Sequence, residues 1–205
     1  LGAWKELLSS AEGTRVTTAM DWPTPEDFRT ADVIVFYQRG QWSAERAGDI
    51  DGFLARGGGL VYIHWAVDGG RDPNGLAERI GLASQGGIRF RHGPLELHFD
   101  RGSKHPIARN FRTVKFVDES YWRMTGDPER IDLLATGIEE HEPQPLFWTM
   151  EPNGGRVFVS ILGHYAWTFD DPLFRVLLLR GIAWSANEPV DRFNELVPLG
   201  ARIAE

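Results

Sequence analysis

Two apolar runs, Asp32-Val33-Ile34-Val35-Phe36-Tyr37 and Leu60-Val61-Tyr62-Ile63, decide the fold class of this chain. Neither run alternates apolar with polar residues, and such runs are typical of strands covered on both faces, as in parallel sheets. Ser43 is a suitable N-cap for a helix between the runs, and the glycines at 57–59 end it. Strand, helix and strand at this spacing predict a right-handed βαβ unit.

The elements on either side extend this unit to a whole domain. Helix follows strand in the first part, strands dominate the second part, and a helix capped by Asp171 closes the pattern. The sequence therefore predicts one three-layer α/β domain over residues 1–205 with a mixed sheet. Further helices are expected at 1–11, 73–81 and 172–187, a helical turn at 24–30, strands at 15–19, 114–117 and 132–136 and within 85–100, a hairpin of 144–150 with 156–162, and coil at 188–205.

The strands without polar alternation should form the core. We expect almost complete burial of the valines and the isoleucine that occupy them, namely Val33, Val35, Val61, Ile63, Val157 and Val159.

Composition excludes several functions. The formal net charge of −7 leaves no basic face for a nucleic-acid backbone, and the apolar runs are too short to span a membrane. The absence of cysteine removes disulfides, thiolate nucleophiles and cysteine-ligated metals. A cytoplasmic and a periplasmic location are both compatible with such a chain.

Two histidines follow predicted buried strands. His64 comes directly after Ile63, and His164 comes two residues after Leu162. Ligands of open α/β sheets bind at the carboxyl ends of the parallel strands, so both imidazoles could share one edge of the sheet. Imidazole serves there as an acid, a base or a metal ligand, although a purely structural role for each histidine stays open.

A carboxylate completes the candidate cluster. Glu119 follows Asp118 after the strand predicted at 114–117, where it could ligate a metal, act as a general base or orient a histidine; a capping or solvated turn is the alternative. His64, His164 and Glu119 would suit a divalent ion such as zinc, or would act as acid and base without a metal.

Aromatic residues flank these polar positions. Their ring faces could stack on the weakly apolar faces of a sugar, while packing in the core is the competing interpretation. The candidates for contact with a substrate are Trp65, Tyr121, Trp122, Tyr165 and Trp167. By contrast, His92, His98 and His141 lack metal-ligand spacing and are expected to be structural or to lie on the surface.

A series of motifs, in order along residues 32–187, resembles the ThuA-like (trehalose utilisation) family. The series is much more specific than any one of its members. It consists of Gly57-Gly58-Gly59-Leu60-Val61-Tyr62-Ile63-His64, His105-Pro106-Ile107-Ala108, Asp118-Glu119-Ser120-Tyr121, Phe147-Trp148-Thr149, Gly155-Arg156-Val157-Phe158, Leu162-Gly163-His164 and Arg180-Gly181-Ile182-Ala183-Trp184.

The resemblance implies a flavodoxin-like fold of the class I glutamine-amidotransferase type, with a largely parallel mixed sheet. In those enzymes a cysteine occupies the sharp turn after the strand that here ends at Ile63, and a histidine follows a later strand. By this analogy His64 takes the cysteine position and His164 the histidine position, so the two should meet. Glutaminase activity is not expected, because imidazole cannot form the required thioester. The family also begins with a strand, whereas this chain opens in a helix at Leu1, so a further strand is expected upstream, beside 32–37.

The family implies a small-molecule carbohydrate as partner. The leading hypothesis is an enzyme that processes a sugar or an oxidised sugar derivative. A non-catalytic sugar-binding or regulatory domain and a metal-dependent hydrolase of another small molecule are the alternatives. A homo-oligomer is compatible with the sequence, which does not identify the substrate.

Overall fold

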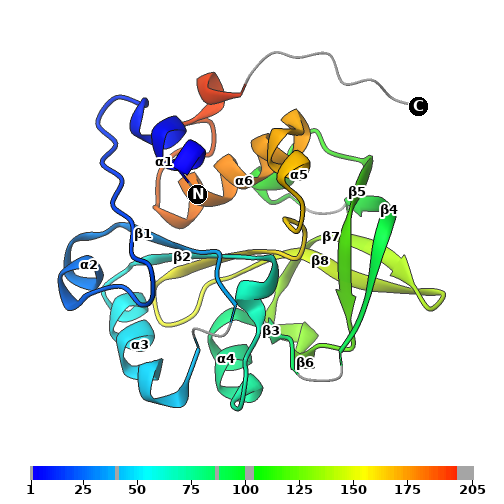
Figure 1. Ribbon diagram of the computed structural model, residues 1–205, viewed down its shortest axis with the longest axis horizontal. Coiled ribbons are helices and arrows are strands. Elements are labelled where there is room, and N and C mark those ends of the chain that lie inside the picture. Colours follow the sequence, from blue (N-terminus) through cyan, green and yellow to red (C-terminus); the bar gives the residue numbers. More distant parts are fainter. Residues whose placement is uncertain (1, 40–41, 86–87, 100–103, 198–205) are drawn as a thin grey trace.

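The computed structural model describes residues 2–39, 42–85, 88–99, 104–197 of the chain, and within them the main sheet has seven strands. Their order differs from their order in the sequence, because crossovers place late strands beside early ones (Figure 1). The order is β1 (Val33–Phe36), β2 (Gly59–Ile63), β9 (Arg156–Ser160), β8 (Glu142–Met150), β7 (Asp132–Glu139), β4 (Arg89–Phe99) and β5 (Thr113–Trp122).

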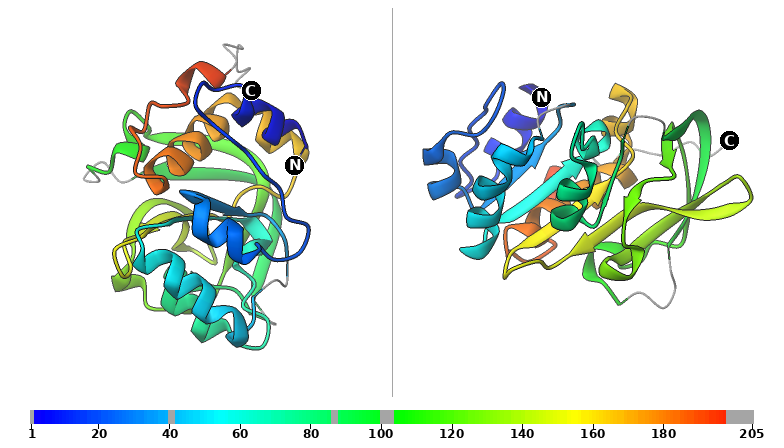
Figure 2. Two further views of the ribbon diagram at one scale, coloured as in Figure 1. Left: turned by 90° about the vertical axis from the view of Figure 1, so that its left-hand side faces the viewer. Right: turned by 90° about the horizontal axis from the view of Figure 1, so that it is seen from below.

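The sheet is mixed, as predicted, but it is not largely parallel, because parallel pairing is confined to β1, β2 and β9 and the other strand pairs are antiparallel. The connection from β1 to β2 runs through helix α3 (Ala47–Ala55), which confirms the strand–helix–strand unit. Helices α3 and α4 (Pro73–Ile80) cover one face of this part of the sheet (Figure 2). The opposite face is covered by α6 (Pro172–Ser185), with α1 (Gly2–Ser9) beyond it, so the molecule has three layers.

Burial is complete in the middle of the sheet and incomplete at its edge. Val61, Ile63, Val157 and Val159 are buried, as predicted. The prediction is wrong for β1, where Val33 is only partly buried and Val35 is 38% exposed. Within the described ranges β1 has a strand neighbour on one side only, β2, so its side chains are covered less than those of a central strand.

The second half of the sheet is antiparallel. Strands β8 and β9 form the predicted hairpin, and the segment within 85–100 contains β4, although residues 86–87 and 100 of that segment lie outside the described ranges. Strand β5 is longer than expected, because the strand predicted at 114–117 continues to Trp122 and pairs with β4 throughout. Asp118 and Glu119 therefore lie inside a strand and not after one.

The remaining elements frame the sheet. A small second sheet joins β3 (Leu82–Ala83) to β6 (Thr125–Gly126), and α2 (Pro25–Thr30) begins at a Thr24–Asp27 capping box. Helix α6 begins at the predicted cap, where the Asp171 carboxylate accepts from the main-chain N–H groups of the first helical turn. Short helix α5 (Ala166–Asp170) precedes it. Within the described ranges no helix is both long and apolar enough to cross a membrane.

Two expectations for the ends of the chain differ from the structure. Residues 15–19 are not a strand, because this β-prone segment lacks a neighbouring strand to pair with. The predicted coil after α6 contains one short 3₁₀ helix at Asn194–Leu196, and residues 198–205 lie outside the described ranges, as does Leu1 of the first helix. A strand upstream of Leu1 stays a prediction.

Candidate functional site

His64 occupies a strained turn at the carboxyl end of β2. The chain turns there from the strand directly into the 3₁₀ helix His64–Val67, and His64 has a φ of 55°. Residues other than glycine uncommonly adopt this left-handed region, although histidine, like asparagine and aspartate, does so more often than most, and such conformations cluster at functional sites. The imidazole is fully buried. The turn thus holds a buried imidazole at the carboxyl end of β2.

His164 reaches the same place from the loop after β9. Gly163 before it has a φ of 129°, and a Cβ atom at that glycine would lie 2.7 Å from Cγ2 of Ile63. The buried Asp118 carboxylate accepts hydrogen bonds from the main-chain N–H groups of Gly163, at 2.9 Å, and of His164, at 3.0 Å. The main chain of His164 is therefore held by β5 and packed against the end of β2.

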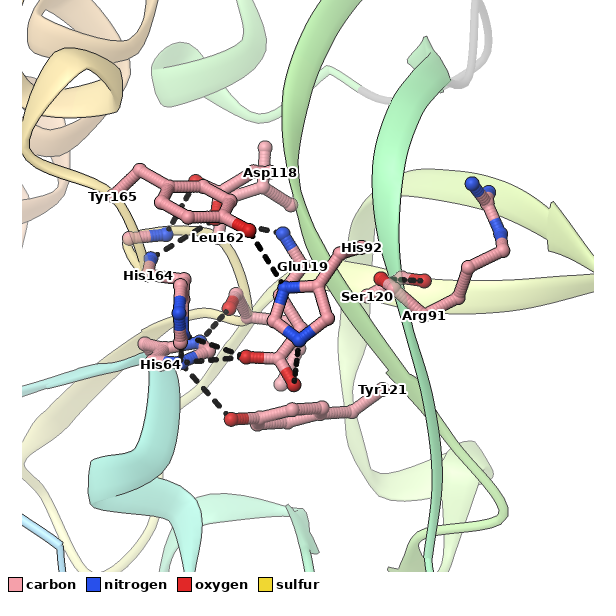
Figure 3. A network of polar contacts seen from close by, with 12 residues as sticks. His64, Arg91, His92, Asp118, Glu119, Ser120, Tyr121, Leu162, His164 and Tyr165 are labelled. Carbon is pink, nitrogen blue, oxygen red and sulfur yellow. Dashed lines mark hydrogen bonds and ion pairs between the residues drawn. The ribbon is translucent and has the colours of Figure 1, made fainter.

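Glu119 lies in β5, the edge strand at the end of the sheet opposite β1. Although it lies inside β5 and not at its end, its side chain extends toward the two histidines (Figure 3). Its Oε2 atom lies 2.7 Å from Nδ1 of His164 and 3.2 Å from Nε2 of His64. Three elements that are distant in sequence thus deliver three polar side chains to one point.

The two imidazoles meet, as the resemblance implied. Nε2 of His64 lies 3.0 Å from Nδ1 of His164, well inside the separation that one ligand can bridge. Nδ1 of His64 lies 2.9 Å from the main-chain carbonyl oxygen of Ile161. A carbonyl can only accept, so Nδ1 carries the proton and Nε2 of a neutral His64 presents a lone pair to the cluster.

Tyr121 supports this arrangement. Its hydroxyl lies 3.0 Å from Nε2 of His64, and its ring stacks on the imidazole with centroids 4.9 Å apart. Burial, and then the negative charge of Glu119, raise the pKa of Tyr121, so the phenol keeps its proton and donates to His64. Tyr121 therefore touches the cluster directly.

Electrostatics favour the ionised form of Glu119. Burial by itself raises the pKa of a carboxyl group, and Glu119 is almost completely buried. The close contact with His64, followed by those with His164 and His92, outweighs burial and holds the pKa of Glu119 below its ordinary value. The carboxylate is therefore negative at neutral pH.

His92 lies on the surface, as expected, and its side chain also reaches the cluster. Its Nε2 atom lies 3.7 Å from Oε1 of Glu119, and its Nδ1 atom lies 2.9 Å from the hydroxyl of Tyr165. Its position in the sequence, inside β4, gave no signal for this. The pairing of His92 with Glu119 across β4 and β5 brings it there, and that register follows from tertiary structure.

Aromatic rings border the cluster on its accessible side. The rings of Tyr165 and Trp167 stack nearly parallel, 4.0 Å between centroids, and Trp167 donates to the carbonyl oxygen of Val117. Trp65 lies edge-on to His164 at 6.2 Å. Both Trp65 and Trp167 remain exposed. These rings flank the cluster, and their contact with a substrate stays a prediction.

Trp122 differs from the other aromatic candidates. It follows Tyr121 in β5, and side chains alternate between the two faces of a strand. Trp122 is buried, and within the described part of the chain its ring stacks on none of the rings of the cluster. Trp122 therefore fits the alternative role considered for the aromatic candidates, which is packing in the core, better than contact with a substrate.

Other histidines lie apart from the cluster. His98 pairs with Glu96 on β4, at 3.4 Å, and the half-buried His105 caps a 3₁₀ turn by accepting from the main-chain N–H of Ile107. A surface hollow lined by His98, Phe99 and residues 133–136 contains none of the three cluster residues. The chemistry suggested by the sequence is therefore concentrated at His64, Glu119 and His164.

Comparison with solved structures finds proteins of similar fold. A ThuA-like protein from Parabacteroides merdae is 25% identical, with a TM-score of 0.65 over 78% of this chain and 72% of that chain. A ThuA-like protein from Bacteroides uniformis is 16% identical, with a TM-score of 0.62 over 82% and 76%. A cytoplasmic protein from Salmonella typhimurium is 18% identical, with a TM-score of 0.53 over 80% and 76%; these last two likenesses concern the fold alone.

A search of curated proteins gave no match. The profile of the ThuA family, described as trehalose utilisation, matches residues 2–185, which is most of the chain. This chain belongs to the ThuA (trehalose utilisation) family.

Proposed function

We propose that this protein is an enzyme that transforms a sugar or an oxidised sugar derivative, with His64, His164 and Glu119 as its reacting centre. The observation that carries the proposal is the convergence of Nε2 of His64, Nδ1 of His164 and Oε2 of Glu119 within 3.2 Å of one another. Two imidazoles and a carboxylate held this way can move protons or activate water near neutral pH.

The strain at His64 supports catalysis over a purely structural role. His64 combines a left-handed main chain with complete burial and three polar neighbours at its Nε2 atom. Such strain persists only where the surrounding structure determines it, and it clusters at active sites. Proton transfer by the imidazole pair and activation of water at a bound metal are the two chemistries that the centre supports.

The substrate class rests on two features. The family to which the chain belongs is described by trehalose utilisation. The exposed Trp65 and the half-buried Tyr165 both lie beside the partly exposed His164, and the exposed Trp167 stacks on Tyr165. Aromatic ring faces pack on the C–H surfaces of sugars. Tyr121 and His92 add polar groups that could contact hydroxyls of a bound sugar.

A non-catalytic sugar-binding domain is the competing function, because the aromatic border alone would suffice for binding. Glu119→Gln separates the two, since it keeps the shape of the side chain and removes its charge. Trehalose and its oxidised keto derivatives are the probes, with binding measured by calorimetry and turnover by NMR. Catalysis predicts that the variant binds within a few-fold of the wild type and loses turnover by about 10²-fold or more. Binding without turnover in the wild type would establish the binding domain instead.

A further inference from the structure

We infer that Nε2 of His64, Nδ1 of His164 and Oε2 of Glu119 form the binding site of one divalent transition-metal ion of the zinc type. The inference rests on the proposed function and deepens it, because it assigns activation of water at a bound metal to the reacting centre. The three residues come from separate parts of the fold. Their ligand atoms all lie within 4.8 Å of one another, close enough to bind one ion.

The orientation of His64 provides the first argument. Its Nδ1 proton is used by the carbonyl oxygen of Ile161, which leaves the Nε2 lone pair directed at the cluster. Histidines that bind metals almost always donate their other ring N–H to a carbonyl or carboxylate in this way, which fixes both the tautomer and the ring. The main chain at 161 thus already provides the outer contact of a metal-bound imidazole.

Charge provides the second argument. Nε2 of His64 lies 3.2 Å from an oxygen of Glu119, inside a region where His64 is fully buried and the Glu119 side chain is 7% exposed. Buried charges are normally paired or coordinate metals. A metal ion at this point would neutralise the buried carboxylate and contact the ring nitrogens of both histidines.

The donor set selects the kind of metal. Two imidazole nitrogens and one carboxylate oxygen are the ligand set of catalytic zinc sites, which keep a fourth position for water or substrate. Calcium and magnesium prefer oxygen ligands only, so they fit this set poorly. His164 is 28% exposed, so the centre is open on one side, where the fourth position would lie.

The separations between the three ligand atoms are close to those of such a site. Ligand atoms bound to zinc at roughly 2.0–2.1 Å in a tetrahedron lie about 3.3 Å apart. The three separations here are 2.7, 3.0 and 3.2 Å, so binding would widen them by about 0.6, 0.3 and 0.1 Å, respectively. The alternative is a network of hydrogen bonds alone, in which His164 donates to Glu119 and Tyr121 donates to His64.

Zinc and cobalt titrations distinguish these two states. The full chain is purified without chelator, its metal is measured by mass spectrometry, and chelator-treated protein is titrated with Zn²⁺ in the calorimeter and with Co²⁺ in the spectrophotometer. The inference predicts one ion per chain, Co²⁺ bands typical of a tetrahedral nitrogen–oxygen site, and a higher unfolding temperature with Zn²⁺.

Matched variants place the ion. Glu119→Gln and His164→Gln should weaken Zn²⁺ binding by at least about 100-fold, since changes outside the ligand shell already cost 10–100-fold. Glu96→Gln and His98→Gln are the controls, because these two residues form an exposed pair on β4. They should bind Zn²⁺ like the wild type. Thermal unfolding of the metal-free variants verifies that each one folds.

Two results would overturn the inference: no stoichiometric binding of Zn²⁺ or Co²⁺ to the wild type, or equal binding to the wild type and the two cluster variants. Failure of the metal site remains distinguishable from failure of the proposed function. Protein that binds neither Zn²⁺ nor Co²⁺ yet still converts oxidised trehalose would refute the metal and leave the enzyme. Protein that binds one Zn²⁺ yet neither binds nor converts the sugars would keep the metal and refute the sugar enzyme.

Discussion

Nδ1 of His64 lies 2.9 Å from the carbonyl oxygen of Ile161, and this single contact orients the reacting centre. Because the carbonyl requires a proton on Nδ1, the lone pair of Nε2 is directed at Glu119 and His164. The contact spans the ends of β2 and β9, two strands that pair in parallel although their sequences are almost a hundred residues apart. The parallel pairing of β2 with β9 therefore brings the Ile161 carbonyl oxygen to His64 and so orients the imidazole.

His64→Asn tests the role of the strained turn. Asparagine is among the few residues that tolerate a positive φ, so the turn should persist and the protein should fold. The shorter side chain cannot meet Glu119 and His164 as the imidazole does, so turnover of oxidised trehalose should fall by about 10²-fold or more. Circular dichroism reports the fold, and NMR reports turnover. Unchanged turnover in a folded variant would contradict the role given to His64.

Asp118→Asn tests how the main chain of His164 is held. The buried carboxylate accepts from the N–H groups of Glu119, Gly163 and His164, whereas an amide would replace one acceptor by a donor. We expect the free energy of unfolding to fall by about 1–3 kcal/mol in urea denaturation. Asp21→Asn is the control, because Asp21 forms only an exposed ion pair with Arg46 and should change stability by less than about 0.5 kcal/mol. Equal stability of the Asp118 and Asp21 variants would show that the anchor is unimportant.

A pair of valines tests the placement of the sheet. Val159 is fully buried in β9, whereas Val35 in β1 is 38% exposed. Val159→Ala should lower the free energy of unfolding by about 1–4 kcal/mol, and Val35→Ala should lower it much less. Denaturant titration of both variants provides the comparison. A larger loss at Val35 than at Val159 would mean that β1 is not the less covered strand.

His105 should make stability depend on pH. Burial lowers its pKa below the ordinary value, and its ring packs edge-on against Trp184 with centroids 4.9 Å apart. The folded state therefore binds this proton less readily than the unfolded chain, so the stabilising contribution is present above about pH 6.5 and is lost as the pH falls through the lower, folded pKa. The wild type should be less stable at pH 5.5 than at pH 7.5, and His105→Gln should reduce that difference. Identical pH dependence in urea denaturation of the two proteins would refute the assignment.

The sequence predicted the central part of the fold because local patterns determine it. The uninterrupted apolar run at 60–63 became a fully buried strand, and Asp171 with Pro172 marked the start of α6 correctly. The errors concern partners that are distant in the sequence. Val35 looks like a central residue by composition, yet β1 lies at the edge of the sheet order, and residues 15–19 form no ladder in spite of their β propensity.

The candidate site was predictable in part. His64 and His164 follow buried strands, and the family resemblance predicted their meeting. Glu119 was selected for a position after a strand that in fact continues to Trp122, so the residue was right while its placement was wrong. His92 carried no signal, because only the register between β4 and β5 brings it to Glu119. The sequence did not show that Tyr121 faces the cluster and Trp122 does not. That difference follows from the alternation of side chains along β5, which reaches Trp122.

Turnover of oxidised trehalose by His164→Ala, followed by NMR beside the wild type and His98→Ala, tests most directly whether this cluster is the reacting centre. His164 is partly exposed, so its removal should leave the fold intact, and His98 is a histidine outside the cluster. We predict a loss of about 10²-fold or more for His164→Ala and wild-type turnover for His98→Ala. Equal rates in all three proteins would contradict the assignment of catalysis to His64, Glu119 and His164.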